Sequence, residues 1–214
     1  MKDIYIIGAG GFGREVADTV HDINKKSETY NMAGFIDDDS SKWGMVINDI
    51  EVKGGTDFLF DLGKNDPGRI HAVIAVGDPD TKVKLARKLD PSVTWENIIH
   101  PTAIISGYAS IGEGNTIQSY ALVNANVKMG NHCLINAGSG LGHDVVLNNY
   151  VSIMSKCDIT GNCVLKDCVY VATSVCVIPG IVVEKNAFLG AGSVIVNDVE
   201  TCATMIGNPA RRVK

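Results

Sequence analysis

The feature that most constrains the fold is an apolar residue that recurs at every sixth position from Ile105 to Ile195. Between these two ends the repeat runs through Ile111, Ile117, Val123, Met129, Ile135, Leu141, Leu147, Ile153, Ile159, Leu165, Val171, Val177, Val183 and Leu189. The residue two positions earlier is often small, as at Ala109 and Ala187. A period of six matches neither the period of a helix face nor that of a strand face.

Self-similarity at a fixed short period indicates a β-helix built from hexapeptides. Each hexapeptide would supply one short strand and one corner, with its apolar residue directed into the axis of a prism. Three hexapeptides would close one triangular coil, and the next coil would stack at the spacing of paired strands, about 4.8 Å. We therefore expect residues eighteen positions apart to lie one above the other. A helical bundle is excluded, because a period of six does not keep a helix face.

The first part of the chain alternates short apolar runs with amphipathic segments. The spacing predicts strands at 4–10, 31–39 and 71–78 and helices at 14–26 and 79–89, while 46–60 is a hairpin or a loop. Such alternation predicts a parallel sheet with right-handed crossovers. We expect a small Rossmann-like α/β domain over residues 1–97 and the β-helix, with a C-terminal tail, over 98–214.

Composition excludes several classes of protein. The net charge of −5 and the pI near 5.5 argue against a nucleic-acid binder. No leader opens the chain and no apolar run approaches the length of a membrane span, so we expect a cytoplasmic protein. The six cysteines form no CxxC pair, and we interpret them as buried thiols rather than metal ligands.

The stretch GSGLGHDVVLNN at 138–149 places His143 two positions after the inward Leu141, outside the core phase. Its ring is therefore expected to reach solvent or a neighbouring subunit, and Asp144 could accept a hydrogen bond from one ring nitrogen. Gly161 follows eighteen residues later and should lie directly over His143. A histidine can act as a general base, and a glycine in that place leaves its backbone N–H open to a ligand. An exposed corner histidine without a catalytic role is the alternative, and it is our interpretation of the other four histidines, which have no such acidic neighbour.

A glycine-rich loop, GAGGFG at 8–13, fits the pattern GxGxxG between a strand and a helix, which is the context of a phosphate-binding loop. Asp37, at the end of the second strand, stands where a dinucleotide enzyme holds a ribose. NAD binding is thus one hypothesis, but only about one βαβαβ half is present and no dehydrogenase domain follows. A tight turn without a ligand is another.

The repeat array, GHD at 142–144, GNPARRVK at 207–214 and GAGGFGREV at 8–16 together resemble the sugar acyltransferases of the PglD and NeuD type. The resemblance covers essentially the whole chain. It implies a small nucleotide-binding domain before a left-handed β-helix, acetyl-CoA as acetyl donor, no metal, and a nucleotide-linked amino sugar as acceptor. It also implies a homotrimer whose active sites lie between adjacent β-helices.

The same resemblance implies roles for individual residues. His143 would be the general base, Asp144 its acidic partner, and Gly161 N–H the donor to the acetyl carbonyl. The sugar nucleotide would contact Gly8, Gly10, Gly11, Phe12, Gly13, Asp37, Asp38, Gly77 and Asn136. The coenzyme would contact Gly161, Gly190, Ala191, Gly192, Pro209 and Arg211. Ser152 replaces a histidine of many relatives, which leaves the sugar or the acyl group open, and Phe12 replaces a histidine of some relatives, which leaves the contacts to the sugar open.

The function expected from the sequence is N-acetylation of a nucleotide-linked amino sugar for a surface glycan or glycoprotein. O-acetylation of a sugar such as a sialic acid remains an alternative, because an amine and a hydroxyl make similar demands on the base. A non-catalytic β-helix scaffold and an NAD-binding protein are alternatives of other classes.

Overall fold

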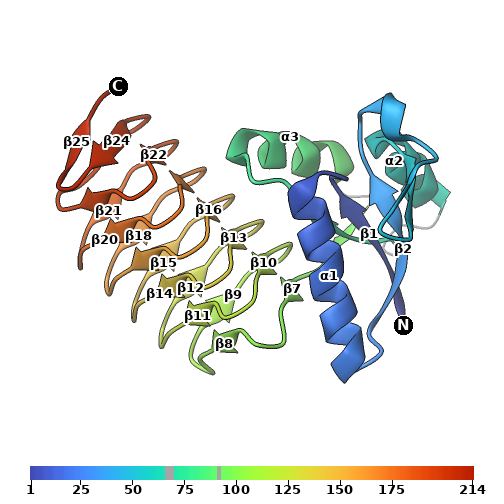
Figure 1. The fold of residues 1–214 in the computed structure, drawn as a ribbon, viewed down its shortest axis with the longest axis horizontal. Helices are drawn as coiled ribbons and strands as arrows, with labels where there is room; N and C mark the ends of the chain where they lie inside the picture. Colours follow the sequence, from blue (N-terminus) through green and yellow to red (C-terminus); the bar gives the residue numbers. More distant parts are fainter. Residues whose placement is uncertain (66–69, 91–92) are drawn as a thin grey trace. The chain divides into compact units, whose positions relative to one another are not determined.

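The computed structural model of the chain describes residues 1–65, 70–90 and 93–214. The chain forms two compact units, Met1–Pro101 and Thr102–Lys214 (Figure 1). The expected division, after residue 97, lies a few residues earlier in the sequence.

The N-terminal unit is built on a six-stranded sheet in the order β3-β4-β2-β1-β5-β6. Its strands are β1 (Lys2–Ile7), β2 (Tyr30–Ile36), β3 (Val46–Ile47), β4 (Ile50–Gly54), β5 (His71–Ile74) and β6 (Thr94–Trp95). All neighbours are parallel except β3 and β4. The helices are α1 (Gly11–Lys26), α2 (Thr56–Asn65) and α3 (Pro79–Leu89), with a short 3-10 helix at Ser40–Lys42.

The predicted parallel sheet is confirmed, but several expected bounds were wrong. Strand β1 ends at Ile7, because the glycines after it leave the sheet, and α1 begins at Gly11 rather than at residue 14. The segment 46–60 forms the antiparallel pair β3 and β4 and then enters α2. The two residues that join β3 to β4, Asn48 and Asp49, both have positive φ, as a two-residue hairpin turn of type I′ requires.

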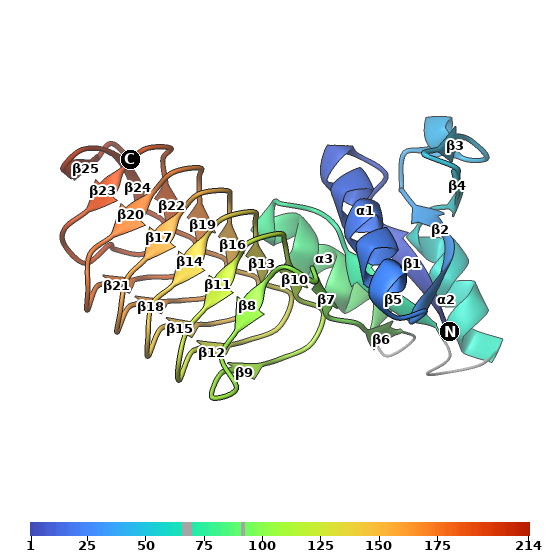
Figure 2. The ribbon, with the colours of Figure 1, turned by 60° about the horizontal axis from the view of Figure 1, so that its bottom comes forward.

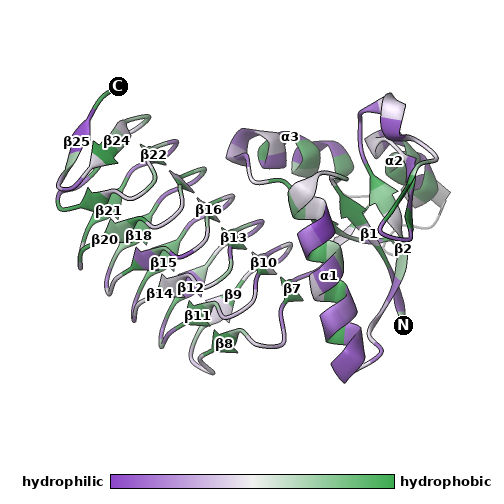
Figure 3. Ribbon diagram, viewed as in Figure 1, coloured by the Kyte–Doolittle hydropathy of each residue, from purple (hydrophilic) through white to green (hydrophobic). Residues whose placement is uncertain are grey.

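The core of the N-terminal unit lies between the sheet and α1. Strands β1 and β2 bury Ile4, Ile6 and Phe35 completely, and α1 buries Val16 and Val20 against them. Figure 3 shows hydrophobic colour along these strands and hydrophilic colour over much of α1, as the amphipathic pattern predicts. This packing fixes the glycine loop that joins β1 to α1.

The C-terminal unit is a left-handed parallel β-helix with three sheets (Figure 2). The first sheet contains β10 (Thr116–Ile117), β13 (Leu134–Ile135), β16 (Ser152–Ile153), β19 (Tyr170–Val171), β22 (Phe188–Leu189), β24 (Thr204–Gly207) and β25 (Ala210–Arg212). The second contains β8 (Ile104–Ile105), β11 (Leu122–Val123), β14 (Gly140–Leu141), β17 (Asp158–Ile159), β20 (Cys176–Val177) and β23 (Val194–Ile195). The third contains β9 (Ser110–Ile111), β12 (Lys128–Met129), β15 (Val146–Leu147), β18 (Val164–Leu165) and β21 (Val182–Val183). The remaining short strand is β7 (Ile98–Ile99).

The six-residue repeat is the structural unit of this β-helix. Each strand from β8 to β23 ends on one of the repeated apolar residues, and those from Ile117 onward are buried. Leu122 pairs with Gly140 and Gly140 with Asp158, so residues eighteen positions apart are stacked as expected. Ile105 and Ile111 are less buried because the first coil has no coil before it to cover it.

The corners of the coils use left-handed backbone and a side-chain ladder. Asn126, Asp144 and Asn162, one above the other, have φ of 63°, 60° and 62°. At a second corner Asn149 Oδ1 accepts from Asn131 N–H and Asp167 Oδ1 accepts from Asn149 N–H, each at 2.9 Å. Asparagine and aspartate therefore serve the corners both through backbone conformation and as caps.

The cysteines follow the predicted interpretation in part. Cys133, Cys157 and Cys163 are buried, and their thiols donate to backbone carbonyls of the next coil at 3.0 to 3.2 Å. Cys168 and Cys176 are half-buried, and Cys202 is exposed, so burial was wrongly expected for that residue.

Candidate active site

His143 and Asp144 form a hydrogen-bonded dyad at a corner between β14 and β15. His143 Nδ1 lies 2.8 Å from Asp144 Oδ2, and the two side chains are 63% and 45% exposed. The left-handed backbone of Asp144 turns its carboxylate back toward the preceding imidazole. A contact with a carboxylate favours a proton on Nδ1, and a neutral ring in that tautomer has Nε2, on its other side, as the basic nitrogen.

Gly161 lies directly over the His143 ring, as the register predicts. A Cβ added to Gly161 would lie 2.6 Å from both Cε1 and Nε2 of His143, and Asn162 N–H donates to His143 O at 2.9 Å. Any residue other than glycine at position 161 would therefore displace the His143 ring. The base nitrogen and the backbone of the next coil are in direct van der Waals proximity.

The backbone N–H of Gly161 is available to a ligand. At the equivalent position of another corner, Asn149 N–H is capped by Asp167 Oδ1 from the coil above. Above Gly161 stands Pro179, whose side chain offers no acceptor, and no acceptor for this N–H occurs within residues 1–65, 70–90 and 93–214. A Cβ at Gly142 would lie 2.5 Å from Gly161 N, so that glycine also keeps the amide uncovered.

The electrostatics of the dyad favour an ionised carboxylate. The hydrogen bond with His143, and after it the hydrogen bond from Asn126, holds the pKa of Asp144 below its ordinary value. Because both side chains are exposed, solvent screens this interaction. An ionised Asp144 stabilises the imidazolium that forms when His143 takes a proton.

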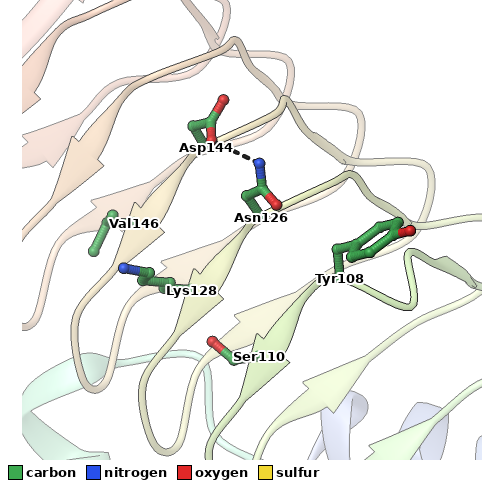
Figure 4. A pocket seen from close by; sticks show the side chains of 6 residues that line it. All are labelled: Tyr108, Ser110, Asn126, Lys128, Asp144 and Val146. Atoms are coloured by element: carbon green, nitrogen blue, oxygen red, sulfur yellow. Dashed lines mark hydrogen bonds between the residues drawn. The ribbon is translucent and has the colours of Figure 1, made fainter.

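A cavity of about 380 Å³ lies beside the dyad on the face of β9, β12 and β15. Figure 4 shows Asp144 and Asn126 side by side on its wall, joined by a hydrogen bond, with Lys128 and Val146 on the neighbouring strands and Tyr108 at its end. Apart from Val146 the lining side chains are polar or amphipathic. The cavity has the size and the chemistry to accept a polar group next to Asp144.

The other residues expected near the dyad lie on different strands. Asn136 follows β13, where its Oδ1 accepts from Ala137 N–H at 2.6 Å. No hydrogen bond joins Asn136 to His143 among the described residues. Ser152 is fully buried on β16, and its hydroxyl has no partner in the described part of the chain. The position therefore exposes no side chain that could replace the histidine found there in relatives.

His71 and His100 have acidic partners that are distant in sequence. His71 Nδ1 lies 2.7 Å from Glu96, which also binds Lys2 and Tyr30. His100 Nε2 lies 3.1 Å from Asp22. These partners of Glu96 are the first residues of three neighbouring strands, β5 (His71), β1 (Lys2) and β2 (Tyr30). The cluster therefore joins the amino ends of these strands, opposite the end that carries the glycine loop.

The glycine loop divides into structural and exposed positions. Gly8 has a φ of +112°, and a Cβ at Gly13 would lie 1.9 Å from Gly8 O, so both glycines are needed for the turn and for the close approach of α1. Gly10 caps α1 and has open space around it, as does Gly11, apart from Arg14 Nη2 at 3.8 Å. Phe12 packs against the core. The N-terminus of α1 with Arg14 beside it is therefore suited to a phosphate.

The two aspartates after β2 have different surroundings. Asp37 Oδ2 accepts from Ala9 N–H and from Lys42 at 2.9 Å, and Asp37 Oδ1 accepts from Asp39 N–H. Burial alone would raise the pKa of Asp37, but these hydrogen bonds outweigh it and lower the pKa. Within the described part of the chain, the hydrogen bonds of Asp38 are made by Oδ1, which accepts from the N–H and hydroxyl of Thr56. Asp37 thus holds the glycine loop, and Asp38 has an oxygen left for a ligand.

A cavity of about 190 Å³ lies at the carboxyl ends of β1, β2 and β5. Its walls are apolar at Ile7, Ile36 and Leu85, and polar at Asp37, Asp38, Thr56 and Thr81. The hydroxyl protons of Thr56 and Thr81 are donated to Asp38 and Asp78. These side chains therefore present acceptors, and a bound molecule has to supply donors, as a nucleobase or a ribose does. Val76 also lines the cavity, and Gly77 follows it in the chain.

The residues expected to meet a coenzyme lie in the last coils. Gly190 approaches β24 closely, since a Cβ there would lie 2.9 Å from Ile206, and its N–H donates to Met205 O. Ala191 follows, and Gly192 has a φ of +69° in open space. Beyond them β24 and β25 form a hairpin around the cis Asn208–Pro209 bond.

The two arginines of the hairpin differ. Arg212 pairs with Glu200, whereas the Arg211 guanidinium contacts only the carbonyl of Ala210 among the residues that the structure places. Arg211 is therefore the arginine with donors left for a phosphate.

Sequence reasoning missed four residues at these sites, Asn126, Arg14, Lys42 and Thr56. Asn126 precedes Asp144 by one coil of eighteen residues, so the register places it under Asp144, but it does not distinguish this asparagine from those at other corners. Arg14 stands in the first turn of α1, where a cation opposes the helix dipole, and that is a signal for a bound anion. Lys42 and Thr56 reach the aspartates through tertiary contacts that no local pattern predicts.

Among residues 1–65, 70–90 and 93–214, no helix has the length and apolar composition of a membrane span. No group of three or more histidine, cysteine, aspartate or glutamate side chains is arranged to hold a metal ion in that part of the chain.

Two family models match the sequence. The PglD N-terminal domain matches residues 3–89, and the bacterial transferase hexapeptide (six repeats) matches residues 108–143. Together the two matches span more than half of the chain. Both the N-terminal unit and the coils that lead to His143 are therefore recognised independently.

Known proteins resemble the chain over most of its length. GDP-perosamine N-acetyltransferase of Escherichia coli O157:H7 is 24% identical, over 98% of this chain and 95% of the relative. UDP-N-acetylbacillosamine N-acetyltransferase of Bacillus subtilis (strain 168) is 32% identical, over 56% of this chain and 52% of the relative. The crystal structure of PerB from Caulobacter crescentus, in complex with CoA and GDP-perosamine, is 25% identical with a TM-score of 0.89, over 100% of this chain and 98% of that chain. The matched N-terminal domain and hexapeptide repeats confirm the predicted resemblance of the chain to the PglD-type sugar acyltransferases.

Proposed function

We propose that the protein transfers the acetyl group of acetyl-CoA to the amine of a nucleotide-linked amino sugar. The observation that carries the proposal is the His143–Asp144 dyad with Gly161 over its ring. The two relatives named above are N-acetyltransferases of sugars linked to GDP or UDP, so a nucleotide-linked amino sugar is the class that they share.

The reaction begins with attack of the sugar amine on the thioester carbonyl carbon. The new C–N bond forms as the carbonyl π pair moves onto oxygen, and His143 Nε2 takes the proton that the nitrogen loses. Asp144 holds Nδ1–H at 2.8 Å and stabilises the imidazolium. A positioned base of this kind contributes about 10²- to 10⁴-fold to the rate.

The tetrahedral intermediate then collapses. Gly161 N–H donates to its oxyanion, and the carbonyl re-forms as the C–S bond breaks. The thiolate of CoA leaves and receives the proton from the imidazolium, which returns His143 to its neutral state. One histidine therefore serves as base and then as acid, and no net proton stays on the protein.

The N-terminal unit would bind the nucleotide of the acceptor. Gly10, Gly11 and Arg14 at the start of α1 suit the phosphates, and the cavity with Asp38 suits the donors of the nucleoside. Asp37 would act indirectly, by holding Ala9 and with it the loop. This division assigns the diphosphate and the nucleoside to separate sides of the loop.

The coenzyme would lie along the last coils, near Gly190, Ala191 and Gly192. The backbone N–H groups of Gly190 and Gly192 already donate to Met205 and Thr173, so contacts there would use other backbone groups and the open space beside Gly192. Pro209 shapes the hairpin that carries Arg211, and Arg211 would meet phosphates of CoA.

The active unit would be a homotrimer with active sites between adjacent β-helices. Apolar side chains are exposed on the first coils, where Ile104 (67%) and Leu122 (38%) are neighbours on the outer face of one sheet and Tyr108 and Tyr120 stand at corners. Association of subunits through this face would remove them from water. Sedimentation would give three subunits for the native chain and fewer for Leu122→Glu; a monomer for both would refute the assembly.

We place the enzyme in the cytoplasm. All six cysteines are free thiols, which fits a reducing compartment. The substrate proposed for the N-terminal unit is a nucleotide-linked sugar, a precursor of a glycan rather than a finished glycan, which also fits this compartment.

The experiment that tests the proposed function is an acceptor panel with acetyl-CoA. GDP-, UDP- and dTDP-linked amino sugars, and the matching sugars with a hydroxyl in place of the amine, are incubated with the enzyme and analysed by mass spectrometry. We expect a gain of one acetyl group on an amino sugar, stable to hydroxylamine as an amide is. Acetylation of the hydroxyl sugars alone, as a hydroxylamine-labile ester, would contradict N-acetylation, and no acetylation of any acceptor would contradict acetyl transfer.

A further inference from the structure

Asn126 stands one coil below Asp144, on the wall of the cavity beside the dyad. Its Nδ2 donates to Asp144 Oδ1 at 3.0 Å, drawn as the dashed line in Figure 4, while Asp144 Oδ2 faces His143 Nδ1 at 2.8 Å. Each carboxylate oxygen therefore has its own partner. One hydrogen bond would leave the carboxylate free to rotate about its side-chain axis, and the second fixes its plane.

The contacts of Asn126 differ from those of asparagines that stabilise the β-helix. Asn124 donates to Leu141 O at 2.9 Å, and Asn131 and Asn149 accept from backbone N–H groups of the preceding coil. Those side chains pair backbone groups, which a coil needs. The side-chain hydrogen bond of Asn126 goes to the carboxylate of the dyad instead, so its role is not to cap the coil.

The exposure of the dyad also makes a second contact to the Asp144 carboxylate important. Asp144 is 45% and His143 63% exposed, so water competes for both of them. A carboxylate in solvent samples several rotamers, and those other than the observed one release the ring. A second donor from the coil below limits that freedom without burying the site.

We propose that Asn126 is a positioning residue of the dyad: by fixing the Asp144 carboxylate it keeps the proton of His143 on Nδ1 and leaves Nε2 as the base. The inference rests on the proposed function for its catalytic consequence, but the tautomer itself can be measured without any reaction. Which nitrogen carries the proton is set by the hydrogen bond that the other makes.

The direct test is the tautomer of His143, measured by two-bond nitrogen–proton correlation spectra of the labelled protein above the titration of the ring. The His143 signals are assigned by their loss in His143→Gln. We expect the native protein to show the Nδ1–H form and Asn126→Ala to show a clear increase of the Nε2–H form. An unchanged tautomer in Asn126→Ala would overturn the proposal, whether or not acetyl transfer is the reaction.

The kinetic test separates positioning from folding. Loss of one exposed hydrogen bond should lower kcat about three- to tenfold in Asn126→Ala while the KM for acetyl-CoA stays unchanged. Asn126→Asp places a second carboxylate within reach of the dyad, so the acid limb of the rate–pH profile should move to higher pH. An unmoved acid limb in Asn126→Asp would contradict the contact between residues 126 and 144, whereas the tautomer is the readout that a merely structural role would not change. A tautomer shift with unchanged kcat would also refute the catalytic part.

Asn186→Ala is the matched control. Asn186 is an exposed corner residue with a φ of 58°, close to the 63° of Asn126, so alanine has a similar backbone cost at both sites. We expect native tautomer, kcat and pH profile in this variant. Equal losses in both variants would assign the effect to the backbone and contradict the proposal.

Discussion

Replacement of Gly161 by alanine separates the catalytic geometry from the stability of the fold. The added Cβ would lie 2.6 Å from Cε1 and Nε2 of His143, whereas carbon atoms in contact are normally about 3.5–4.0 Å apart. The ring therefore has to move by about 1 Å or rotate away. Because the side chain is 63% exposed, the ring can move into solvent, and we expect the free energy of unfolding to change by less than about 1 kcal/mol.

The cost should fall on the reaction instead. A misplacement of about 1 Å in a reacting group costs about 10²-fold in rate, so we expect kcat to fall by about that factor. The substitution keeps the backbone N–H, and thus changes the position of the base without removing the proposed oxyanion donor. The assay is release of the CoA thiol with a saturating acceptor, together with thermal or chemical unfolding of the same samples.

Gly107→Ala is the control, since Gly107 occupies the same corner two coils before His143 and a Cβ there would meet nothing within 4 Å. We expect native activity and stability for it. Native kcat in Gly161→Ala would refute the argument that the ring reacts from its place under Gly161. A large loss of stability would refute the argument that the ring alone absorbs the clash.

Three further outcomes follow from the same geometry. Asp144→Asn should lower kcat about 10- to 100-fold, because an amide does not stabilise the imidazolium, and the KM for acetyl-CoA should stay constant in steady-state assays. Asp37→Asn should lower the free energy of unfolding by about 1–3 kcal/mol at pH 7. The folded-state pKa of Asp37 lies below its ordinary value, so its contribution exists above about pH 3.9 and is lost as the pH falls further; urea unfolding should show the two proteins converge there. Arg211→Ala should raise the KM for acetyl-CoA about tenfold at unchanged kcat, whereas Arg212→Ala, whose arginine already pairs with Glu200, should not.

Much of this fold follows from the sequence because the β-helix has a strict register. The six-residue repeat determines which side chains point inward, and the eighteen-residue coil places Gly161 over His143. By the same arithmetic Asn126 lies under Asp144, but an asparagine at a corner is so common that the pattern alone gives it no special role. The hydrogen bond, which depends on side-chain rotamers, provides the distinction.

The N-terminal unit is less predictable because its contacts are not periodic. The pattern GxGxxG places the loop correctly but cannot separate Gly8 and Gly13, which the turn needs, from Gly10 and Gly11, which stay open. The sequence also predicts the same kind of role, contact with the sugar nucleotide, for both Asp37 and Asp38. Their different roles arise from Lys42 and Thr56, which reach them from other elements of the fold.

The general-base role of His143 is tested by comparing the rate of acetyl transfer catalysed by His143→Ala with that of the native enzyme. We expect kcat to fall by about 10²- to 10⁴-fold while circular dichroism, the melting temperature and the affinity for CoA stay native, because the ring is exposed and its removal leaves the coil intact. A variant that folds, binds CoA and acetylates the acceptor at the native rate would contradict the assignment of His143 as the general base.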